Sequence, residues 1–209
     1  MSAPWPKLQR DLVAILRGLR PQEARDVGRA VFEAGIQAIE VPLNSPDPFR
    51  SIEIIVADLG EHALVGAGTV VEKEAVSNLA EAGGRLLVAP NVDTAVLARA
   101  AELSMVTMPG VFTPSEAFTA IKAGASALKF FPASVLGPKG IAAIGAVLPK
   151  GVPVGVVGGV SEADFADYAK VGVRTFGLGS SLYKPGMSAV DVGARAKAAV
   201  EAWDRVFGG

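Results

Sequence analysis

A single lysine interrupts the apolar run from Ala127 to Pro132. In a strand, Leu128 and Phe130 would point to one side and Lys129 to the other. If both sides of that strand are covered, the Lys129 ammonium cannot reach bulk water, and burial lowers the pKa of an amine. A neutral amine is a nucleophile toward carbonyl carbons. Lys129 is therefore a candidate for imine formation.

Three more side chains, in or next to apolar runs, could transfer protons or bind a substrate. Glu40 lies inside Ala38–Pro42, where it would move protons or pair with a neighbouring cation. The guanidinium of Arg17 would clamp a carboxylate or phosphate, or lie on the surface. Thr69 would bind a substrate oxygen, or cap a helix that starts near Glu72.

Two glycine-containing turns near the end of the chain predict a phosphate site. Gly158-Gly159 lets the backbone come close to a ligand, and Gly179-Ser180 forms a second such turn. Ser161 and Asp164 have the spacing of a capping box, which predicts a helix start directly after the first turn. Free amides at such a start bind phosphate, although tight turns alone would also explain the glycines.

The composition excludes several other classes of function. The 209 residues carry 20 Lys+Arg against 21 Asp+Glu, for a formal charge of -1, so neither nucleic acid nor a membrane is an expected partner. There is no cysteine, and the one histidine, His62, is interpreted as a surface loop residue, so no metal site and no cofactor are expected. The first residues do not resemble a signal peptide, and a cytoplasmic protein is predicted.

Eight short apolar runs recur along the chain and indicate buried parallel strands. Because helical segments separate most of them, we predict one compact (β/α)8 TIM barrel domain over residues 1–209. An open doubly wound sheet is the alternative, but no dinucleotide-binding glycine motif follows the first run. The predicted strands are Val13–Leu16, Ala38–Val41, Ala63–Gly66, Leu86–Ala89, Met105–Met108, Ala127–Phe130, Pro153–Val157 and Thr175–Leu178.

Segments of helical periodicity lie between these strands, and four of them run into a glycine that predicts the helix end. A last helix from about residue 187 has apolar residues at helical spacing and should pack outside the barrel. The other predicted helices are Pro21–Ala34, Glu72–Ala82, Thr94–Glu102, Ser115–Ala123, Ile141–Leu148 and Glu162–Val171.

In such a barrel the carboxyl ends of all strands meet at one mouth, where active sites lie. A lysine nucleophile, a carboxylate and a phosphate cradle together fit a class I aldolase acting on a phosphorylated substrate. The candidate catalytic residues are Lys129 and Glu40. The candidate substrate-binding residues are Arg17, Asn44, Thr69, Pro90, Phe131, Val157, Gly158, Gly159, Gly179 and Ser180.

Four motifs together resemble the 2-keto-3-deoxy-6-phosphogluconate/phosphogalactonate aldolases: residues 40–45 (EVPLNS), 66–69 (GAGT), 127–132 (ALKFFP) and 158–160 (GGV). The resemblance runs from about Leu12 to Tyr183. It implies a homotrimeric, metal-independent class I aldolase that forms pyruvate and D-glyceraldehyde 3-phosphate.

By that resemblance Lys129 forms the Schiff base and Glu40 is the general acid/base, acting through a water. Arg17 and Thr69 would bind the carboxylate end of the substrate. Its phosphate would lie on Gly159, Gly179 and Ser180.

Two positions depart from the phosphogluconate pattern. Val157 stands where those enzymes usually have threonine, and Asn44 where many have arginine. A threonine hydroxyl can bind the C4 hydroxyl of one epimer, whereas valine cannot. The chain therefore resembles the phosphogalactonate branch, which acts in galactonate degradation; the gluconate epimer or dual use is the alternative. Asn44 leaves Arg17 as the candidate carboxylate clamp.

Two readings from other classes remain. A phosphate-binding barrel isomerase or synthase would need the cradle but not Lys129. A non-catalytic sugar-phosphate binding protein would also need no lysine nucleophile.

Overall fold

The computed structural model describes residues 2–208, so Met1 and Gly209, which the predicted domain and last helix include, lie outside the described residues. Within that part of the chain, nine strands form one sheet in the order β5-β4-β3-β2-β1-β9-β8-β7-β6, and all neighbours are parallel. The strands are β1 Leu12–Ile15, β2 Ala38–Pro42, β3 Leu64–Gly68, β4 Leu86–Val88, β5 Val106–Met108, β6 Gly110–Val111, β7 Leu128–Phe130, β8 Val154–Val157 and β9 Thr175–Leu178.

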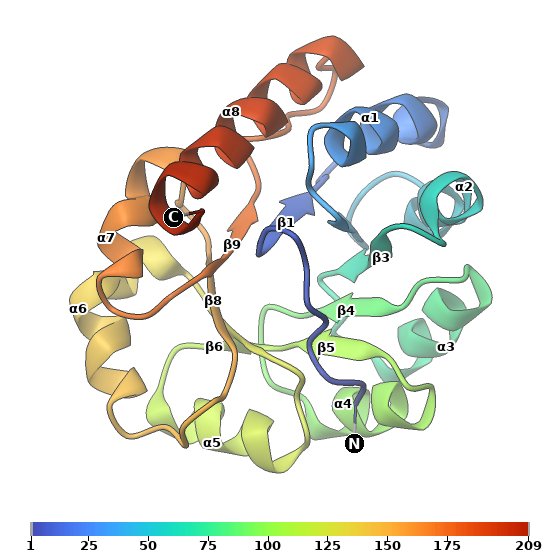
Figure 1. The fold of residues 1–209 in the computed structure, drawn as a ribbon. Helices are drawn as coiled ribbons and strands as arrows, with labels where there is room; N and C mark the ends of the chain where they lie inside the picture. The colour runs from blue at the N-terminus through green and yellow to red at the C-terminus, as the bar shows by residue number, and fades with distance from the viewer. Residues whose placement is uncertain (1, 209) are drawn as a thin grey trace.

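Helices surround the sheet on its outer side (Figure 1). They are α1 Pro21–Glu33, α2 Pro48–Leu59, α3 Lys73–Glu81, α4 Thr94–Glu102, α5 Pro114–Lys122, α6 Ala133–Gly145, the 3₁₀ turn η1 Glu162–Asp164, α7 Phe165–Ala169 and α8 Ala189–Phe207. The four glycines predicted to end helices, Gly35, Gly83, Gly124 and Gly172, all have positive φ, as a left-handed C-terminal position requires.

The sheet closes on itself through its fifth strand. Pro109 divides this strand into β5, which pairs with β4, and β6, which pairs with β7. Proline has no N–H to donate, but the Pro109 carbonyl accepts a hydrogen bond from the Lys129 amide at 2.9 Å. Counting β5 and β6 as one strand, the described chain is a closed eight-stranded (β/α)8 barrel, which confirms the predicted fold.

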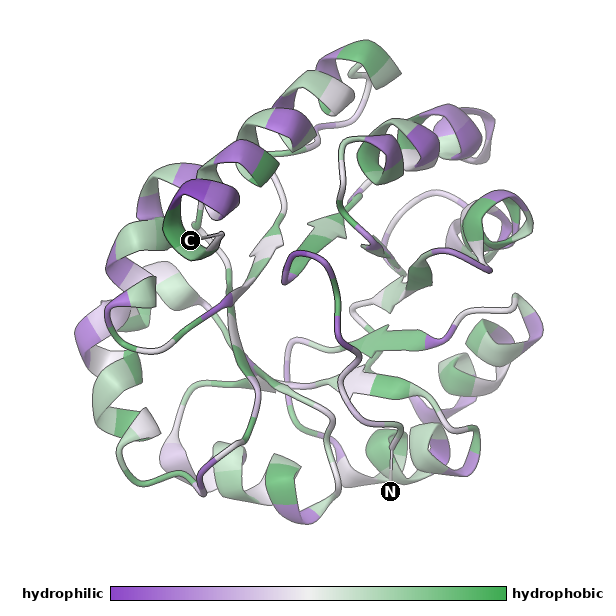
Figure 2. Ribbon diagram, in the orientation of Figure 1, coloured by the Kyte–Doolittle hydropathy of each residue, from purple (hydrophilic) through white to green (hydrophobic). Residues whose placement is uncertain are grey.

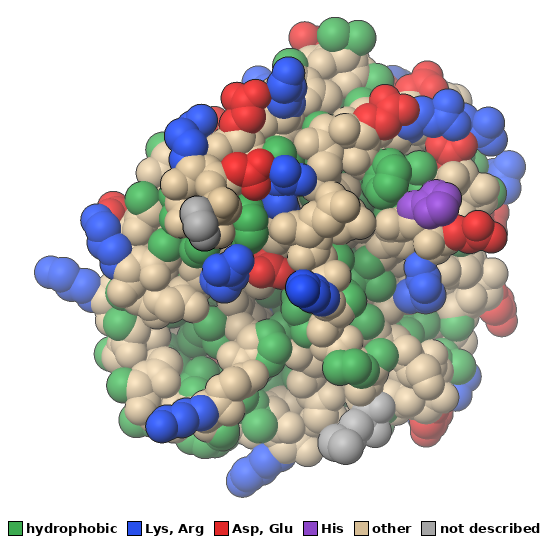
Figure 3. Space-filling view, viewed as in Figure 1, with side chains coloured by type: hydrophobic (Ala, Val, Ile, Leu, Met, Phe, Trp, Pro, Cys, Tyr) green, Lys and Arg blue, Asp and Glu red, His purple; other side chains and the backbone are tan. Residues whose placement is uncertain are grey.

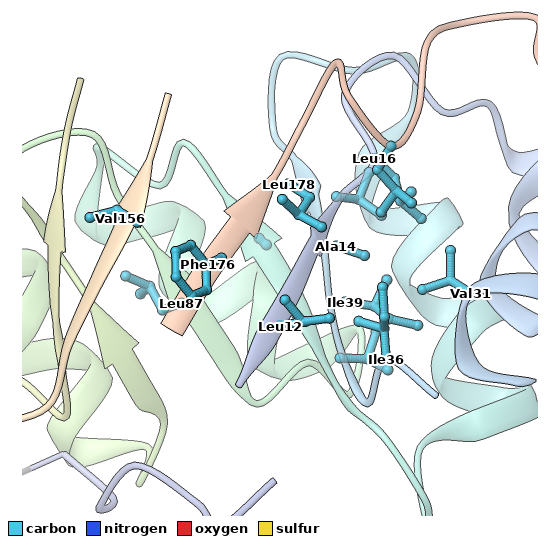
Figure 4. Packing of buried hydrophobic residues seen from close by; sticks show 14 of the residues in the cluster. Leu12, Ala14, Leu16, Val31, Ile36, Ile39, Leu87, Val156, Phe176 and Leu178 are labelled. Carbon is cyan, nitrogen blue, oxygen red and sulfur yellow. The ribbon is translucent and has the colours of Figure 1, made fainter. Parts of the chain in front are cut away.

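Both sides of the barrel wall are covered, so successive side chains alternate between two apolar layers. On β1, Leu12 and Ala14 point outward to residues such as Ile39 and Val31 between the strands and helices (Figure 4). Val13 points inward to a separate interior cluster with Ala38, Leu86, Val88, Val106, Met108 and Ala127.

The segment before β1 covers the amino-terminal end of the barrel, across the face seen in Figures 1 and 3. Ala3 forms a parallel bridge with Val106, and Trp5 and Leu8 pack against the interior cluster. Apolar side chains and a few charged ones share the middle of this face, and further charged side chains lie along its rim (Figure 3). This end is therefore closed, which leaves the carboxyl end as the open mouth.

Two helices differ from the sequence analysis. Helix α2 was not predicted, although Pro48 occupies its first turn and Ile52, Ile55 and Leu59 form its buried face. Helix α6 starts at Ala133 instead of Ile141, because the chain turns directly out of β7; it then bends at Gly137, where φ is 64°.

The helices mix hydrophilic and hydrophobic residues, whereas the barrel strands are largely hydrophobic or neutral (Figure 2). This is the pattern of helices that pack one face on a core and expose the other. Among the described residues, the structure contains no helix that combines the length and the apolar character needed to cross a membrane.

Candidate active site

The inward-pointing residues of each strand rise in steps from the interior cluster to the mouth. On β1 and the residues after it, Val13 is followed two positions on by Ile15 and then by Arg17. Ile15 pairs in register with Glu40 of β2. Ala127, directly before β7, lies in the interior cluster, and Lys129 of β7 lies two residues nearer the mouth. The barrel thus brings the two predicted catalytic residues to its inner wall, near the carboxyl ends of β2 and β7.

Glu40 is buried, with 2% of its surface exposed, and its Oε2 atom has no hydrogen-bond partner in the described chain. Burial raises the pKa of Glu40 from 4.5 to about 7, although the charges of Lys129 and Arg17 oppose the shift. Gly68, at the end of β3, makes room for this carboxylate: a Cβ there would lie within van der Waals overlap of Oε2. A carboxyl group with a pKa near 7 can both accept and donate protons at neutral pH.

Lys129 is also buried, with 6% exposed. Burial lowers the pKa of Lys129 from 10.5 to about 8; the charge of Glu40 opposes the shift, and that of Arg17 adds to it. Its register neighbours on both sides are glycines, Gly110 and Gly155. The Nζ atom lies 4.7 Å from the centroid of the Phe131 ring, and no carboxylate of the described chain is within 4.0 Å of it.

Arg17 and Asn44 form a contact between the loops after β1 and β2. The Nη1 atom of Arg17 donates to Asn44 Oδ1 at 2.6 Å. Beside it, the Gly18 amide donates to Ser45 Oγ at 2.8 Å, and Ser45 is buried. The bond to Asn44 holds the exposed Arg17 guanidinium at the mouth, and its other nitrogen donors have no partner in the described chain.

A hollow of about 290 Å³ opens at the mouth on the side of β1, β7, β8 and β9. It contains seven of the predicted substrate-binding residues: Arg17, Phe131, Val157, Gly158, Gly159, Gly179 and Ser180. The other lining residues are Ile15, Val160, Gly177, Tyr183, Lys184 and Pro185. Lys129 lies next to this hollow, because the Phe131 ring that it contacts forms part of its wall.

The two predicted turns form one side of the hollow. Gly158 and Gly159 have φ of 93° and 72°, a conformation that side chains disfavour. The predicted capping box is confirmed: the Ser161 amide donates to Asp164 Oδ2 at 2.8 Å, and the Ser161 hydroxyl bonds the same oxygen at 3.0 Å. Within the described chain, the Gly159 and Ser180 amides donate no backbone hydrogen bond, which leaves them free for an anion.

Thr69 and Pro90 lie away from this hollow. Thr69 shares a shallow second hollow with Leu43 and Asn44. The helix-cap alternative for Thr69 is wrong, because the N-cap of α3 is Glu72; instead Thr69 has φ of 57°. The Pro90 carbonyl lies where a Cβ on Gly110 would be, so Pro90 packs against the strand next to Lys129.

Four residues of this region, Ile15, Gly68, Tyr183 and Lys184, have no role predicted from the sequence. Ile15 was identifiable, since it lies two positions before Arg17 on the same strand side. Lys184 follows the Gly179-Ser180 turn closely enough to have been considered. The contact of Gly68 with Glu40 and the place of Tyr183 in the lining of the hollow depend on contacts between distant segments, which no local pattern indicates.

The chemistry open to this mouth is that of a barrel enzyme with an amine nucleophile. A buried amine with a lowered pKa can add to a carbonyl, and the carboxyl group on the neighbouring wall can transfer the protons that such a reaction moves. Among the described residues, no group of three or more His, Asp or Glu side chains is placed to hold a metal ion.

Comparison with known proteins leads to the same class. The family model for KDPG and KHG aldolase matches residues 7–194. The chain is 62% identical to a probable 2-dehydro-3-deoxy-6-phosphogalactonate aldolase of Rhizobium meliloti (strain 1021), over 99% of this chain and 97% of the relative. It is 46% identical to the 2-dehydro-3-deoxy-6-phosphogalactonate aldolase of Escherichia coli (strain K12), over 92% and 94%.

Among solved structures, one described as native KDPGal superposes with a TM-score of 0.95 at 44% identity, covering 99% of this chain and 100% of the other. The chain belongs to the KDPG and KHG aldolase family. It is therefore an aldolase, a lyase that breaks carbon–carbon bonds.

Proposed function

We propose that this chain, as a single-domain enzyme, cleaves 2-dehydro-3-deoxy-6-phospho-D-galactonate to pyruvate and D-glyceraldehyde 3-phosphate through a Schiff base on Lys129. The observation that carries the proposal is the buried Lys129 amine, which has a pKa of about 8 and lies beside Glu40 below a mouth hollow. The relatives at 62% and 46% identity are both named for this substrate.

The reaction starts when the Lys129 amine adds to the C2 carbonyl of the substrate and one water leaves, which gives an iminium. Removal of the proton from the C4 hydroxyl then lets the C3–C4 bond break, and its electron pair moves toward the iminium nitrogen. The aldehyde product departs, C3 of the enamine takes up a proton, and water hydrolyses the imine to pyruvate and free lysine.

Glu40 is proposed to move these protons. Its pKa of about 7 suits both directions of transfer, and its unpartnered Oε2 leaves a position for a bridging water. In this proposal Arg17, Asn44 and Thr69 bind the carboxylate end of the substrate. Phe131 and Pro90 shape the pocket beside Lys129, and the phosphate lies against Gly158, Gly159, Gly179 and Ser180.

Trapping with borohydride tests the mechanism. The protein is incubated with pyruvate, reduced, digested and analysed by mass spectrometry. We expect one reduced pyruvyl adduct, on the peptide that contains Lys129, and none in Lys129→Ala. Lys122→Ala, which removes an exposed lysine of α5, should keep the adduct. Absence of an adduct in the natural chain would favour a barrel isomerase or a non-catalytic binding protein.

The epimer preference depends on Val157, which is 7% exposed and lines the hollow. Valine offers the C4 hydroxyl no hydrogen bond, so we propose that the galacto epimer is preferred over the gluco epimer. Comparing kcat/KM on both phosphosugars tests this. Val157→Thr should move the ratio toward the gluco epimer by about 10-fold, the size of one gained hydrogen bond; an unchanged ratio would contradict the assignment.

The assembly is proposed to be a homotrimer in the cytoplasm, within galactonate degradation. Val135 on α6 is 70% exposed, as expected of an apolar residue at a subunit contact. A chain 45% identical to this one belongs to a designed cage made by fusing symmetric oligomeric domains. Light scattering after size-exclusion chromatography should give three times the 21.4 kDa chain mass; a monomer mass would refute the trimer.

A further inference from the structure

The hollow at the mouth has a strongly positive lining in a chain of formal charge -1. Two cationic side chains, Arg17 and Lys184, line it, and no Asp or Glu does so. A concave site with charges of one sign attracts ligands of the other sign. The hollow is therefore suited to an anion with more than one negative charge.

The two cations differ in what they already bind. Arg17 donates to Asn44 at 2.6 Å, on the side of β1 and β2. Lys184 is exposed and has no ion pair with another described residue. The Lys184 ammonium is thus the cation of the hollow that has no partner in the described chain. Lys184 lies in the loop after β9, which also contains Gly179 and Ser180.

The backbone of Lys184 is nevertheless held in place. The Gly179 carbonyl accepts hydrogen bonds from the amides of Leu182 and Tyr183, both at 2.9 Å, and these two side chains are buried. On the other side, Pro185 packs against Gly18: a Cβ there would lie 2.6 Å from the proline Cγ. The loop is therefore anchored on both sides of Lys184, and its side chain extends from a fixed point on the rim.

We propose that Lys184 is a substrate-binding residue whose ammonium contacts the phosphate dianion of the substrate, opposite the amides of Gly159 and Ser180. This inference rests on the proposed function, because it assumes a phosphorylated substrate. Neutral amides alone would leave a dianion uncompensated, and a charge-assisted hydrogen bond from an ammonium is stronger than a neutral one. Since the phosphate does not react, Lys184 should affect substrate binding more than turnover.

The test compares steady-state cleavage by Lys184→Gln, Lys184→Arg and the control Lys197→Gln, which removes an exposed lysine of α8. At low ionic strength, Lys184→Gln should raise KM about 3- to 10-fold with kcat within about 2-fold, because an exposed charge contact is modest and screened by salt. Lys184→Arg should keep a KM near that of the natural chain. Inhibition by inorganic phosphate should weaken in Lys184→Gln by a similar factor.

Borohydride trapping with pyruvate tests the Schiff-base function separately from the phosphate contact of Lys184, because pyruvate has no phosphate. If the natural chain traps pyruvate and cleaves the phosphosugar while Lys184→Gln has the KM of Lys197→Gln, the role of Lys184 is refuted and the aldolase proposal stands. A lower kcat at constant KM would also refute it. If the natural chain traps no pyruvate, the proposed function itself fails.

Discussion

At the amino-terminal end of the barrel, the buried residues Thr107 and Ser126 are hydrogen-bonded to each other, whereas the buried ionisable side chains near its mouth, Glu40 and Lys129, have no such partner in the described chain. At the closed end, the Thr107 amide donates to Ser126 Oγ at 2.8 Å, and the Ser126 amide donates to Thr107 Oγ1 at 3.1 Å. The Ser126 hydroxyl also bonds the Ala3 carbonyl. Near the mouth, Glu40 Oε2 has no partner in the described chain, and Lys129 has no carboxylate within 4.0 Å.

The difference separates groups that stabilise the fold from groups that react. Satisfied polar groups in a core add modestly to stability, and leaving one unpaired is costly. Buried ionisable groups without partners cost free energy, but the same burial gives Glu40 and Lys129 pKa values near neutrality. The comparison predicts that changes at the mouth remove activity without loss of stability, and that changes at the closed end do the reverse.

The largest expected effect is that of Lys129→Met. It removes the nucleophile, so kcat for aldol cleavage should fall by about 10⁴-fold or more. At pH 7 the free energy of unfolding should stay equal or rise, because the natural chain must bury an ammonium there. Product assays and urea denaturation measure the two quantities. A variant that is inactive and also strongly destabilised would break the comparison, since Lys129 would then be a structural residue.

Gly68→Ala should have the next largest effect. Its new Cβ would overlap the Glu40 carboxylate, which must move. A displacement of about 1 Å can cost about 10²-fold in rate, and we expect a loss of that order in kcat. The matched control is Gly145→Ala at the end of α6, where an added Cβ meets nothing within 4 Å. If both variants have the kcat of the natural chain, the glycine is not what positions Glu40.

Stability should depend on pH through Glu40. Its folded-state pKa of about 7 exceeds the ordinary 4.5, so the stabilisation is complete below pH 4.5 and is lost as pH rises through 7. The loss should be about 1–3 kcal/mol. Lys129 has the opposite effect, and in a higher pH range. Because burial lowers its pKa from 10.5 to about 8, the free energy of unfolding should rise with pH between 8 and 10.5.

Urea denaturation at pH 5 and pH 7 tests the Glu40 contribution. Glu40→Gln does not titrate, so its unfolding free energy should change less between these pH values than that of the natural chain. Glu81→Gln, at an exposed position on α3, controls for general charge effects. Equal pH dependence in Glu40→Gln and the natural chain would mean that burial of Glu40 does not shift its pKa.

The burial of the reactive groups at the mouth can be predicted from the sequence, because the alternation of side chains along a strand depends only on neighbouring residues. The alternation in residues 127–131 predicts Lys129 on the side opposite Leu128 and Phe130. In the structure Leu128 and Phe130 lie in the outer apolar layer, and the Lys129 amine contacts the Phe131 ring at the mouth. The start of α6 was not predictable from periodicity, since Gly137 and Pro138 interrupt the pattern. The role of Gly68 arises only when β3 and the distant Glu40 of β2 are brought together.

The paired groups at the closed end were not predicted for the same physical reason. Ser126 lies directly before the apolar run that contains Lys129, and its partners Thr107 and Ala3 are 19 and 123 positions away in the sequence. A short serine or threonine gives no sign of being buried until its strand neighbours are known. Such hydrogen-bond partners are set by how neighbouring strands align with each other, which the sequence of one strand does not show.

Ser126→Ala should have the smallest effect, and it is confined to stability. The substitution removes the acceptor for the buried Thr107 amide and the donor to the Ala3 carbonyl, so the free energy of unfolding should fall by about 1–2 kcal/mol. Because Ser126 lies two residues before β7, on the side of the closed end and away from the Lys129 amine, kcat/KM should not change. Ser115→Ala, at an exposed position on α5, is the control and should leave both quantities unchanged. If Ser126→Ala lowers kcat/KM as well, the closed end also positions Lys129, and the division between the two ends is not as sharp as their hydrogen bonds indicate.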